Sequence, residues 1–316
     1  MADVKKVATR DAYGKALAAL GAEHDNLVVL DADLANATKT QTFQKAFPDR
    51  HFDCGIAEAN MICVAAGMST TGLVPFASSF AMFLAGRAFE QIRNSVGYPH
   101  LNVKLGATHG GITVGEDGAT HQCLEDFALM RTIPGMTVIC PCDAVETRAA
   151  VEAAIKYNGP VYLRFGRAAT PVLFDKETYE FTWGKGVVMA DGDDAAIIAC
   201  GTMVDIALSA RELLKADGIN ARVINMHTIK PIDKELVLKA AAETGAIVTA
   251  EEHNILGGLG EAVAGVVAEA NPVPVLRVGT EDTFGRSGKV PPLMEMYGLT
   301  AENIAAKVKK AISLKK

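Results

Sequence analysis

The sequence predicts an α/β protein of two domains, each a mostly parallel sheet flanked by helices on both faces. Short, all-apolar runs alternate with segments of helical spacing along the chain, as strand–helix–strand units do. The length of 316 residues suggests roughly two such domains. The apolar periodicity stops over residues 168–186, which contain Pro171 and the only tryptophan, Trp183. We therefore predict a first domain at 1–170, a linker at 171–186 and a second domain at 187–316.

The first half begins with helical spacing over residues 9–23, for which Thr9 is the expected N-cap. Alternation then predicts strand 27–30, helix 38–47, strand 52–56, helix 58–69, strand 73–77, helix 80–96 and strand 102–106. After a glycine-rich stretch come helix 123–131, strand 136–140, helix 144–157 with Asp143 as its N-cap, and strand 161–165. Because ligands lie beyond the carboxyl ends of parallel strands, polar residues that follow these strands are site candidates.

The second half repeats this alternation with fewer reactive side chains in its loops. The pattern predicts strand 195–199, helix 203–216, strands 221–225 and 246–250, helix 260–270 and strand 275–278. Gly257 to Gly260 could cradle an anion, but a simple helix entry is the preferred interpretation. We interpret His227 and His253 as structural or interface residues.

Composition and charge exclude several classes of protein. The net charge is −6 and no basic run occurs, which argues against nucleic acid as a partner. The sequence contains no run of about 18 apolar residues, so we expect no membrane span. The polar segment 1–9 lacks the apolar core of a signal peptide, and we therefore expect a cytoplasmic protein. The six cysteines form no Cys-x-x-Cys pair and mostly lie in apolar segments, which favours reduced, buried thiols and no bound metal on this chain.

A glycine-rich loop from Thr108 to Gln122 is the strongest local signal. It carries His109, Asp117 and His121 among four glycines. Glycines allow left-handed backbone and close ligand approach, and imidazoles beside a carboxylate suit proton transfer. The bland alternative is a surface turn with solvated histidines. Because loops carry sites more often than core elements do, we predict that this loop lines a catalytic cleft.

Four segments together resemble the C-terminal half of transketolase. They are Asp31-Ala32-Asp33-Leu34, the run Gly55 to Met61 around Glu58, the segment Phe76 to Phe83, and the glycine-rich loop. The first half resembles the family's pyrimidine-binding domain and the second half its C-terminal domain. The resemblance implies an enzyme of the pentose phosphate pathway that transfers a two-carbon ketol unit from a ketose phosphate to an aldose phosphate, using thiamine diphosphate.

The motif that holds the diphosphate in this family is not recognised in the first half. This motif consists of Gly-Asp-Gly with a downstream asparagine. The similar run Ala190 to Asp194 lies in the second half, between two predicted strands, and is interpreted as a turn. The resemblance therefore implies a split enzyme, in which an N-terminal-half subunit supplies the diphosphate site and the Mg²⁺ ligands. We expect the cofactor at the interface of a heterotetramer, and no activity from this chain alone.

The resemblance also assigns roles to individual residues. Glu58 would activate the pyrimidine ring of the cofactor, which Phe83 stacks on, with Phe80 beside it and Asp33 near the thiamine. His109 and Asp117 would contact hydroxyls of the sugar donor, and His121 would lie near the reacting carbons, so Glu58, His121 and His109 are the catalytic candidates. The substrate candidates are Arg10, His109, Asp117, His121 and Arg167.

Plainer roles remain open for several of these residues. Phe80 and Phe83 could form the core face of a helix, and Asp33 could be a helix cap. Arg164 lies three residues from Arg167 and could be the phosphate ligand instead. A family serine near the phosphate is replaced in the run 35–38, where Thr38 offers the hydroxyl.

Two other functions remain as alternatives. The chain could be the beta subunit of a 2-oxo-acid dehydrogenase, which shares the domain order and a matching glutamate. The spacing of His109, Asp117 and His121 favours transketolase. A non-catalytic regulatory or scaffold half is the second alternative, against which Glu58 and the polar loop argue.

Overall fold

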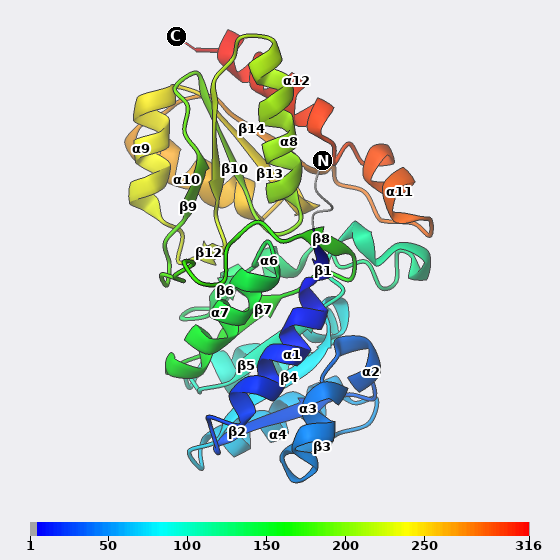
Figure 1. Ribbon diagram of the computed structural model, residues 1–316. Coiled ribbons are helices and arrows are strands. Elements are labelled where there is room, and N and C mark those ends of the chain that lie inside the picture. The colour runs from blue at the N-terminus through cyan, green and yellow to red at the C-terminus, as the bar shows by residue number, and fades with distance from the viewer. Residues whose placement is uncertain (1–4, 316) are drawn as a thin grey trace.

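The computed structural model describes residues 5–315 as two α/β halves, each built around its own sheet (Figure 1). The first sheet has the strand order β12-β6-β7-β5-β4-β2-β3. Its strands from the first half are β2 (Leu27–Asp31), β3 (His51–Asp53), β4 (Val74–Phe80), β5 (Lys104–Thr108), β6 (Thr137–Ile139) and β7 (Val161–Arg164). These six run parallel. β2, β4 and β5 are buried at every position, as strands covered on both faces must be.

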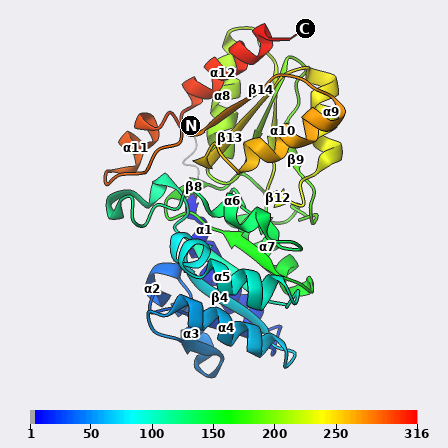
Figure 2. The ribbon, with the colours of Figure 1, turned by 180° about the vertical axis from the view of Figure 1, so that it is seen from behind.

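Helices cover both faces of the first sheet. One face carries α1 (Thr9–Gly21), α3 (Gln41–Ala46) and α7 (Ala144–Lys156), which share a core with Tyr13 and Phe76. The opposite face carries α4 (Glu58–Ser69) and α6 (Asp126–Thr132). α1 and α7 face the viewer in Figure 1, and α4 does so from behind in Figure 2. Two single turns, α2 (Ala35–Thr38) and η1 (Pro48–Arg50), join β2 to β3.

The second sheet has the order β14-β13-β10-β11-β9 and is parallel except for β9. Its strands are β9 (Val187–Ala190), β10 (Ala195–Ala199), β11 (Ala221–Asn225), β13 (Ile247–Asn254) and β14 (Val275–Thr280). One face carries α8 (Met203–Ala216) and α12 (Ala301–Ser313), and the other carries α9 (Lys234–Thr244) and α10 (Leu259–Ala270). Helix α11 (Val290–Met296) packs instead against residues 112–117 of the first half.

The two halves are interlocked rather than merely adjacent. β12 (Thr228–Lys230) belongs to the second half of the chain but pairs antiparallel with β6 of the first sheet. β1 (Lys6–Ala8) pairs with β8 (Ala169–Pro171) as a separate antiparallel ribbon. One apolar core continues from Met130 on α6 through Met226 to Leu259 on α10. The α/β architecture with two mostly parallel sheets is confirmed, while the division at residues 171–186 stays a prediction.

Several local predictions were wrong. The helix expected over 80–96 starts with Phe80 still in β4 and continues as π-helix η2 (Met82–Arg87), a short α5 (Phe89–Gln91) and π-helix η3 (Ile92–Gly97). π-turns are rare and often accompany functional sites. The helix expected over 38–47 is broken by Lys39, whose φ of 72° is left-handed. Strands β1, β8, β9 and β12 and helices α9 and α11 were not predicted.

The two predicted helix caps had opposite outcomes. Asp143 accepts a hydrogen bond from the amide of Glu146 at 2.8 Å and caps α7 as expected. Thr9 is not the N-cap of α1, because Ala8 holds that position. The Thr9 hydroxyl instead accepts from the amide of Gly166 at 2.8 Å, so a long-range contact competes with the local one.

No helix within residues 5–315 is both long and apolar enough to cross a membrane. All six cysteines are free thiols, and Cys63 is exposed, contrary to the expectation of buried thiols.

The run Gly257 to Gly260 forms the entry to helix α10, which was the preferred interpretation of its sequence. The amides of Leu259 and Gly260 donate to the buried Glu251 carboxylate at 2.7 and 2.8 Å. An internal carboxylate therefore takes the anion position at the start of α10.

Candidate active site

The candidate residues gather at the carboxyl ends of three neighbouring strands. β2, β4 and β5 lie side by side in the sheet and end at Asp31, Phe80 and Thr108. The glycine-rich loop leaves β5 directly and forms a short 3₁₀ segment, η4 (Ile112–Asp117). The parallel register therefore brings segments far apart in sequence to one edge.

Residues from the second half of the chain hydrogen-bond to the glycine-rich loop. The amide of Thr113 donates to Glu252 Oε1 at 2.6 Å, across the junction between the two halves. Gly111 has a φ of 86°, and a Cβ there would lie 2.3 Å from the same carboxylate oxygen. Gln122 Nε2 donates to the carbonyl of Arg286 at 3.0 Å. The loop conformation is thus set by β13 and by the segment before α11.

Arg164 and Arg167 have different structural roles. Arg164 is buried, and its Nε donates to Asp126 Oδ2 at 3.0 Å. Its Nη2 donates to the carbonyls of Cys123 and Glu252 at 3.3 and 2.8 Å. A Cβ at Gly110 would lie 2.1 Å from Arg164 Nε, so this guanidinium packs directly against the backbone of the loop. These contacts leave Arg164 no access to a substrate.

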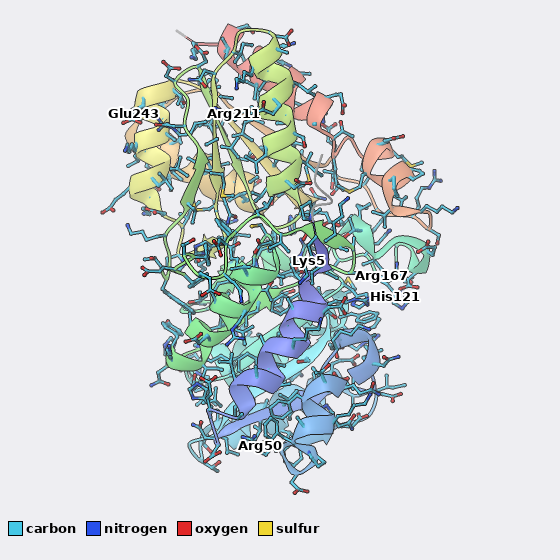
Figure 3. The ribbon with its side chains drawn as sticks, in the orientation of Figure 1. Lys5, Arg50, His121, Arg167, Arg211 and Glu243 are labelled. Atoms are coloured by element: carbon cyan, nitrogen blue, oxygen red, sulfur yellow. The ribbon has the colours of Figure 1, made fainter. Side chains whose placement is uncertain are left out.

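Arg167 is one-third exposed and lies beside the loop rather than under it. Its Nη1 donates to the carbonyl of Val114 at 2.6 Å and to the exposed Glu116 carboxylate at 3.1 Å. Figure 3 labels Arg167 and His121 close together at the margin of the molecule, near the level where the two halves meet. Of the two arginines left open by the sequence, Arg167 is the one that can meet a substrate.

His109 is fixed as one neutral tautomer. Arg10 Nη1 can only donate, so His109 Nε2 accepts that bond at 2.8 Å. Nδ1 then carries the proton and donates to the Thr108 hydroxyl at 2.8 Å. Burial, followed by the positive charges of Arg10 and Arg167, lowers the pKa of His109 to about 3. His109 therefore stays uncharged near neutrality, and it can reach a sugar hydroxyl only by exchanging its bond to Arg10.

Aromatic rings form a wall between the two histidines. The Phe80 ring stacks on His109 with centroids 3.7 Å apart and on Phe83 with centroids 5.5 Å apart. His121 meets the Phe83 ring edge-on at 5.3 Å. Phe80 is buried at the end of β4, whereas Phe83 is partly exposed on η2. The wall offers a flat apolar surface bordered by hydrogen-bonding groups.

Glu58 is the first residue of α4, and its side chain is 2% exposed. Arg87 Nη1 lies 2.9 Å from both of its carboxylate oxygens. The same guanidinium lies 4.5 Å over the Phe83 ring, although half of the Arg87 side chain is exposed. A flat, hydrogen-bond-donating cation therefore sits between the face of Phe83 and the carboxylate of Glu58.

The strand-end acids differ from expectation. Asp31 is the buried one and accepts from the hydroxyls of Thr38 and Thr40, each at 2.8 Å. Burial raises the pKa of Asp31 to about 6. Asp33 is exposed, has a φ of 60°, and caps no helix. Because Thr38 is committed to Asp31, its hydroxyl does not replace the missing serine.

The remaining candidates lie around Arg10. Its Nη1 also donates to the carbonyl of Ala37 at 3.2 Å. Burial lowers the pKa of Arg10, and the charges of Arg167 and Asp117 also act on it, the first lowering and the second raising it. Asp117 is exposed, and His121 pairs its Nδ1 with the Thr120 hydroxyl at 2.9 Å. The structure thus groups Arg10, His109 and Arg167, with Asp117 and His121 toward the solvent side.

Sequence reasoning missed four residues that shape the site: Asp31, Arg87, Glu252 and Gln122. Arg87 could have been noticed, because it follows the aromatic segment by one helical turn. Asp31 carries a local signal as a strand-end acid, but its burial, like the roles of Glu252 and Gln122, depends on partners that only the fold brings near. Within residues 5–315, no three His, Cys, Asp or Glu side chains are placed to hold a metal ion.

Comparison with known proteins identifies the family of the chain. The family model "Transketolase, pyrimidine binding domain" matches residues 5–172, and "Transketolase, C-terminal domain" matches residues 184–304. A Methanocaldococcus jannaschii protein, provisionally described as a transketolase C-terminal section, is 51% identical over 301 residues, which cover 95% of this chain and 94% of that protein.

Two further matches span nearly the whole chain. The 6-deoxy-6-sulfo-D-fructose transketolase subunit of a Clostridium species is 45% identical, covering 93% of this chain and 91% of that subunit. A solved structure titled split gene transketolase, inactive beta4 tetramer, is 52% identical with a TM-score of 0.91, covering 99% and 100%. Two family models that together span most of the described residues, and relatives at this identity, lead to one conclusion: the chain belongs to the transketolase family.

Proposed function

We propose that this chain is one subunit of a two-chain transketolase that transfers a two-carbon ketol unit from a ketose phosphate to an aldose phosphate. The observation that carries the proposal is the buried Glu58 carboxylate at the start of α4, which is linked to the face of the Phe83 ring through the Arg87 guanidinium. Relatives that are themselves named as a section or a subunit of transketolase support the two-chain arrangement. We further propose a heterotetramer with an N-terminal-half subunit.

The residues present fit the pyrimidine ring of thiamine diphosphate, the cofactor of this family. Arg87 already demonstrates that a flat group can lie on Phe83 while donating hydrogen bonds to Glu58. Phe83 would take the face of the ring, Phe80 would support Phe83, and Glu58 would form a hydrogen bond with a ring nitrogen, sharing one proton with it. The exposed Asp33 would lie at the margin of this pocket. When bound, the cofactor supplies the electron sink for breaking and making the carbon–carbon bond.

The protein's own part is binding, orientation and proton transfer. His121, partly exposed and next to Phe83, would exchange protons with the substrate oxygens, while Asp117 would accept from sugar hydroxyls. When the substrate binds Arg10 and breaks its bond to His109, the neutral His109 would accept a hydrogen bond from a sugar hydroxyl at Nε2. Arg10 and Arg167 would bind the phosphate group, for which guanidinium geometry is suited. The proposal places the diphosphate and Mg²⁺ ligands on the partner subunit.

Reconstitution tests the proposal. The chain is mixed with its N-terminal-half subunit, thiamine diphosphate and Mg²⁺, and ketol transfer is measured by product formation. We expect activity only in the mixture, and a loss of at least about a hundredfold in kcat for Glu58→Gln, because the amide cannot accept the proton that a carboxylate can. Glu90→Gln, which changes an exposed acid on α5, is the matched control.

The other candidate functions make different predictions. Decarboxylation of a 2-oxo acid, without ketol transfer, would assign the complex to the 2-oxo-acid dehydrogenases. Full activity of Glu58→Gln would support a non-catalytic half. The sugar itself, the pathway and the cytoplasmic location stay predictions.

A further inference from the structure

We propose that Lys39 is a specificity-determining residue, which joins Arg10 and Arg167 in a subsite for the terminal phosphate of the sugar. This inference rests on the proposed function and names a substrate-binding residue that the family resemblance did not supply. It starts from the turn between α2 and α3, where Lys39 is the break in the predicted helix.

The backbone holds Lys39 in an unusual conformation. Its φ of 72° is left-handed, which is uncommon for a side chain other than Gly, Asn or Asp. α1 presses closely on this turn, since a Cβ at Gly14 would lie 2.3 Å from the Lys39 carbonyl oxygen. Non-glycine residues in this region cost free energy and cluster at ligand sites. The turn is therefore held against α1 by close backbone packing at Gly14.

The same turn is joined to the candidate substrate residues. Arg10 Nη1 donates to the Ala37 carbonyl at 3.2 Å and to His109 Nε2 at 2.8 Å. The positive charges of Arg10, Arg167 and Lys39 all act on the His109 ring. The turn that carries Lys39 is therefore joined through Arg10 to the buried His109 imidazole, and Arg167 binds the glycine-rich loop from the segment after β7.

The acidic side chains near Lys39 and Arg167 form only exposed or long ion pairs with them. Lys39 Nζ lies 3.9 Å from Asp11 Oδ1, too far for a hydrogen bond, and both side chains are more than 30% exposed. Arg167 pairs with Glu116, which is 63% exposed, and Asp117 is exposed as well. Exposed pairs of this kind contribute little. A phosphate can therefore displace them and bind all three cations at small cost.

Charge, rather than a hydroxyl, is what this turn offers to an anion. Ala37 presents a methyl group, and the Thr38 and Thr40 hydroxyls both donate to Asp31. Lys39 is the residue of the turn that brings a positive charge to phosphate oxygens, whereas the exposed Asn36 can donate only from a neutral amide. A subsite built on charge favours a dianionic phosphate over a neutral sugar end, and its affinity falls as ionic strength rises.

Steady-state kinetics of the assembled two-subunit enzyme test the proposal with Lys39→Asn and Lys39→Arg. Asparagine tolerates the left-handed backbone, so it removes the charge and keeps the turn. For a ketose phosphate donor, we expect Lys39→Asn to raise KM about tenfold with kcat within twofold. The same ketose without phosphate should show unchanged constants. Lys39→Arg should restore most of the KM, and Lys45→Asn, an exposed lysine on α3, should behave as wild type.

An equal rise in KM for both donors, or no rise for the phosphorylated one, would overturn the role of Lys39. Absence of ketol transfer by the wild-type complex would instead refute the proposed function. In that case the role of Lys39 is tested by calorimetric titration with inorganic phosphate, which measures the phosphate affinity of the wild-type and Lys39→Asn complexes. Weaker binding by Lys39→Asn supports the subsite, and equal binding refutes it.

Discussion

Exchanging each of the two neighbouring arginines for methionine should separate a structural role from a substrate role. In Arg164→Met, the buried Asp126 carboxylate loses its cation, and the carbonyls of Cys123 and Glu252 lose a donor. Breaking a buried ion pair from one side costs about 3–5 kcal/mol. With an unfolding entropy near 2 cal/mol/K per residue, this loss lowers Tm by about 5–8 °C for a chain of this length.

Arg167→Met should have the opposite profile. Its ion pair with Glu116 is exposed, so we expect a stability loss below about 1 kcal/mol. KM for a phosphorylated donor should rise at least about tenfold, because a charge-assisted phosphate contact is lost. Thermal unfolding by circular dichroism measures the first effect, and kinetics of the assembled enzyme measure the second. A Tm for Arg164→Met within about 2 °C of wild type, or an equally large Tm loss for Arg167→Met, would refute this reasoning.

Two other expectations concern Arg87 and His109. Because the Arg87 guanidinium lies between Phe83 and Glu58, Arg87→Met should remove a competitor and lower the Kd of thiamine diphosphate for the assembled protein about five- to tenfold; fluorescence titration measures this, and an unchanged or higher Kd contradicts it. The folded-state pKa of His109, about 3, lies below the unfolded value near 6.5, so its contribution to stability is complete above pH 6.5 and is lost as the pH falls. Between pH 7.5 and 5.5, wild type should lose about 1.4 kcal/mol more unfolding free energy than His109→Gln, as measured by guanidinium titration; parallel losses would show that His109 titrates normally.

Features that depend on neighbouring residues were predictable. The alternation of apolar runs and helical spacing identified parallel strands such as 27–30 and 161–165, and Glu58 was correctly placed at the start of a helix. The Asp143 cap was also predictable, because its donor lies three residues away. The glycine-rich loop was recognised because glycine composition limits backbone conformation locally.

Features that depend on distant partners were not predictable. Asp31 and Asp33 are both strand-end acids in the sequence, and only the folding of Thr38 and Thr40 over the strand end makes Asp31 the buried one. Likewise, β12 joins the first sheet from the second half of the chain, which no local pattern indicates.

The sequence by itself therefore determined the α/β architecture and the segments from which a site is drawn, since periodicity, capping and turn chemistry act over a few residues. The family followed separately, from the resemblance of four segments to transketolase. Only the tertiary structure decided that Arg164 supports the loop while Arg167 lies beside it, that His109 is held as one neutral tautomer, and that Glu252 fixes Thr113 from 139 residues away. The physical reason is that the charge state and accessibility of a polar side chain depend on which groups desolvate and pair with it, and those groups come from the whole fold.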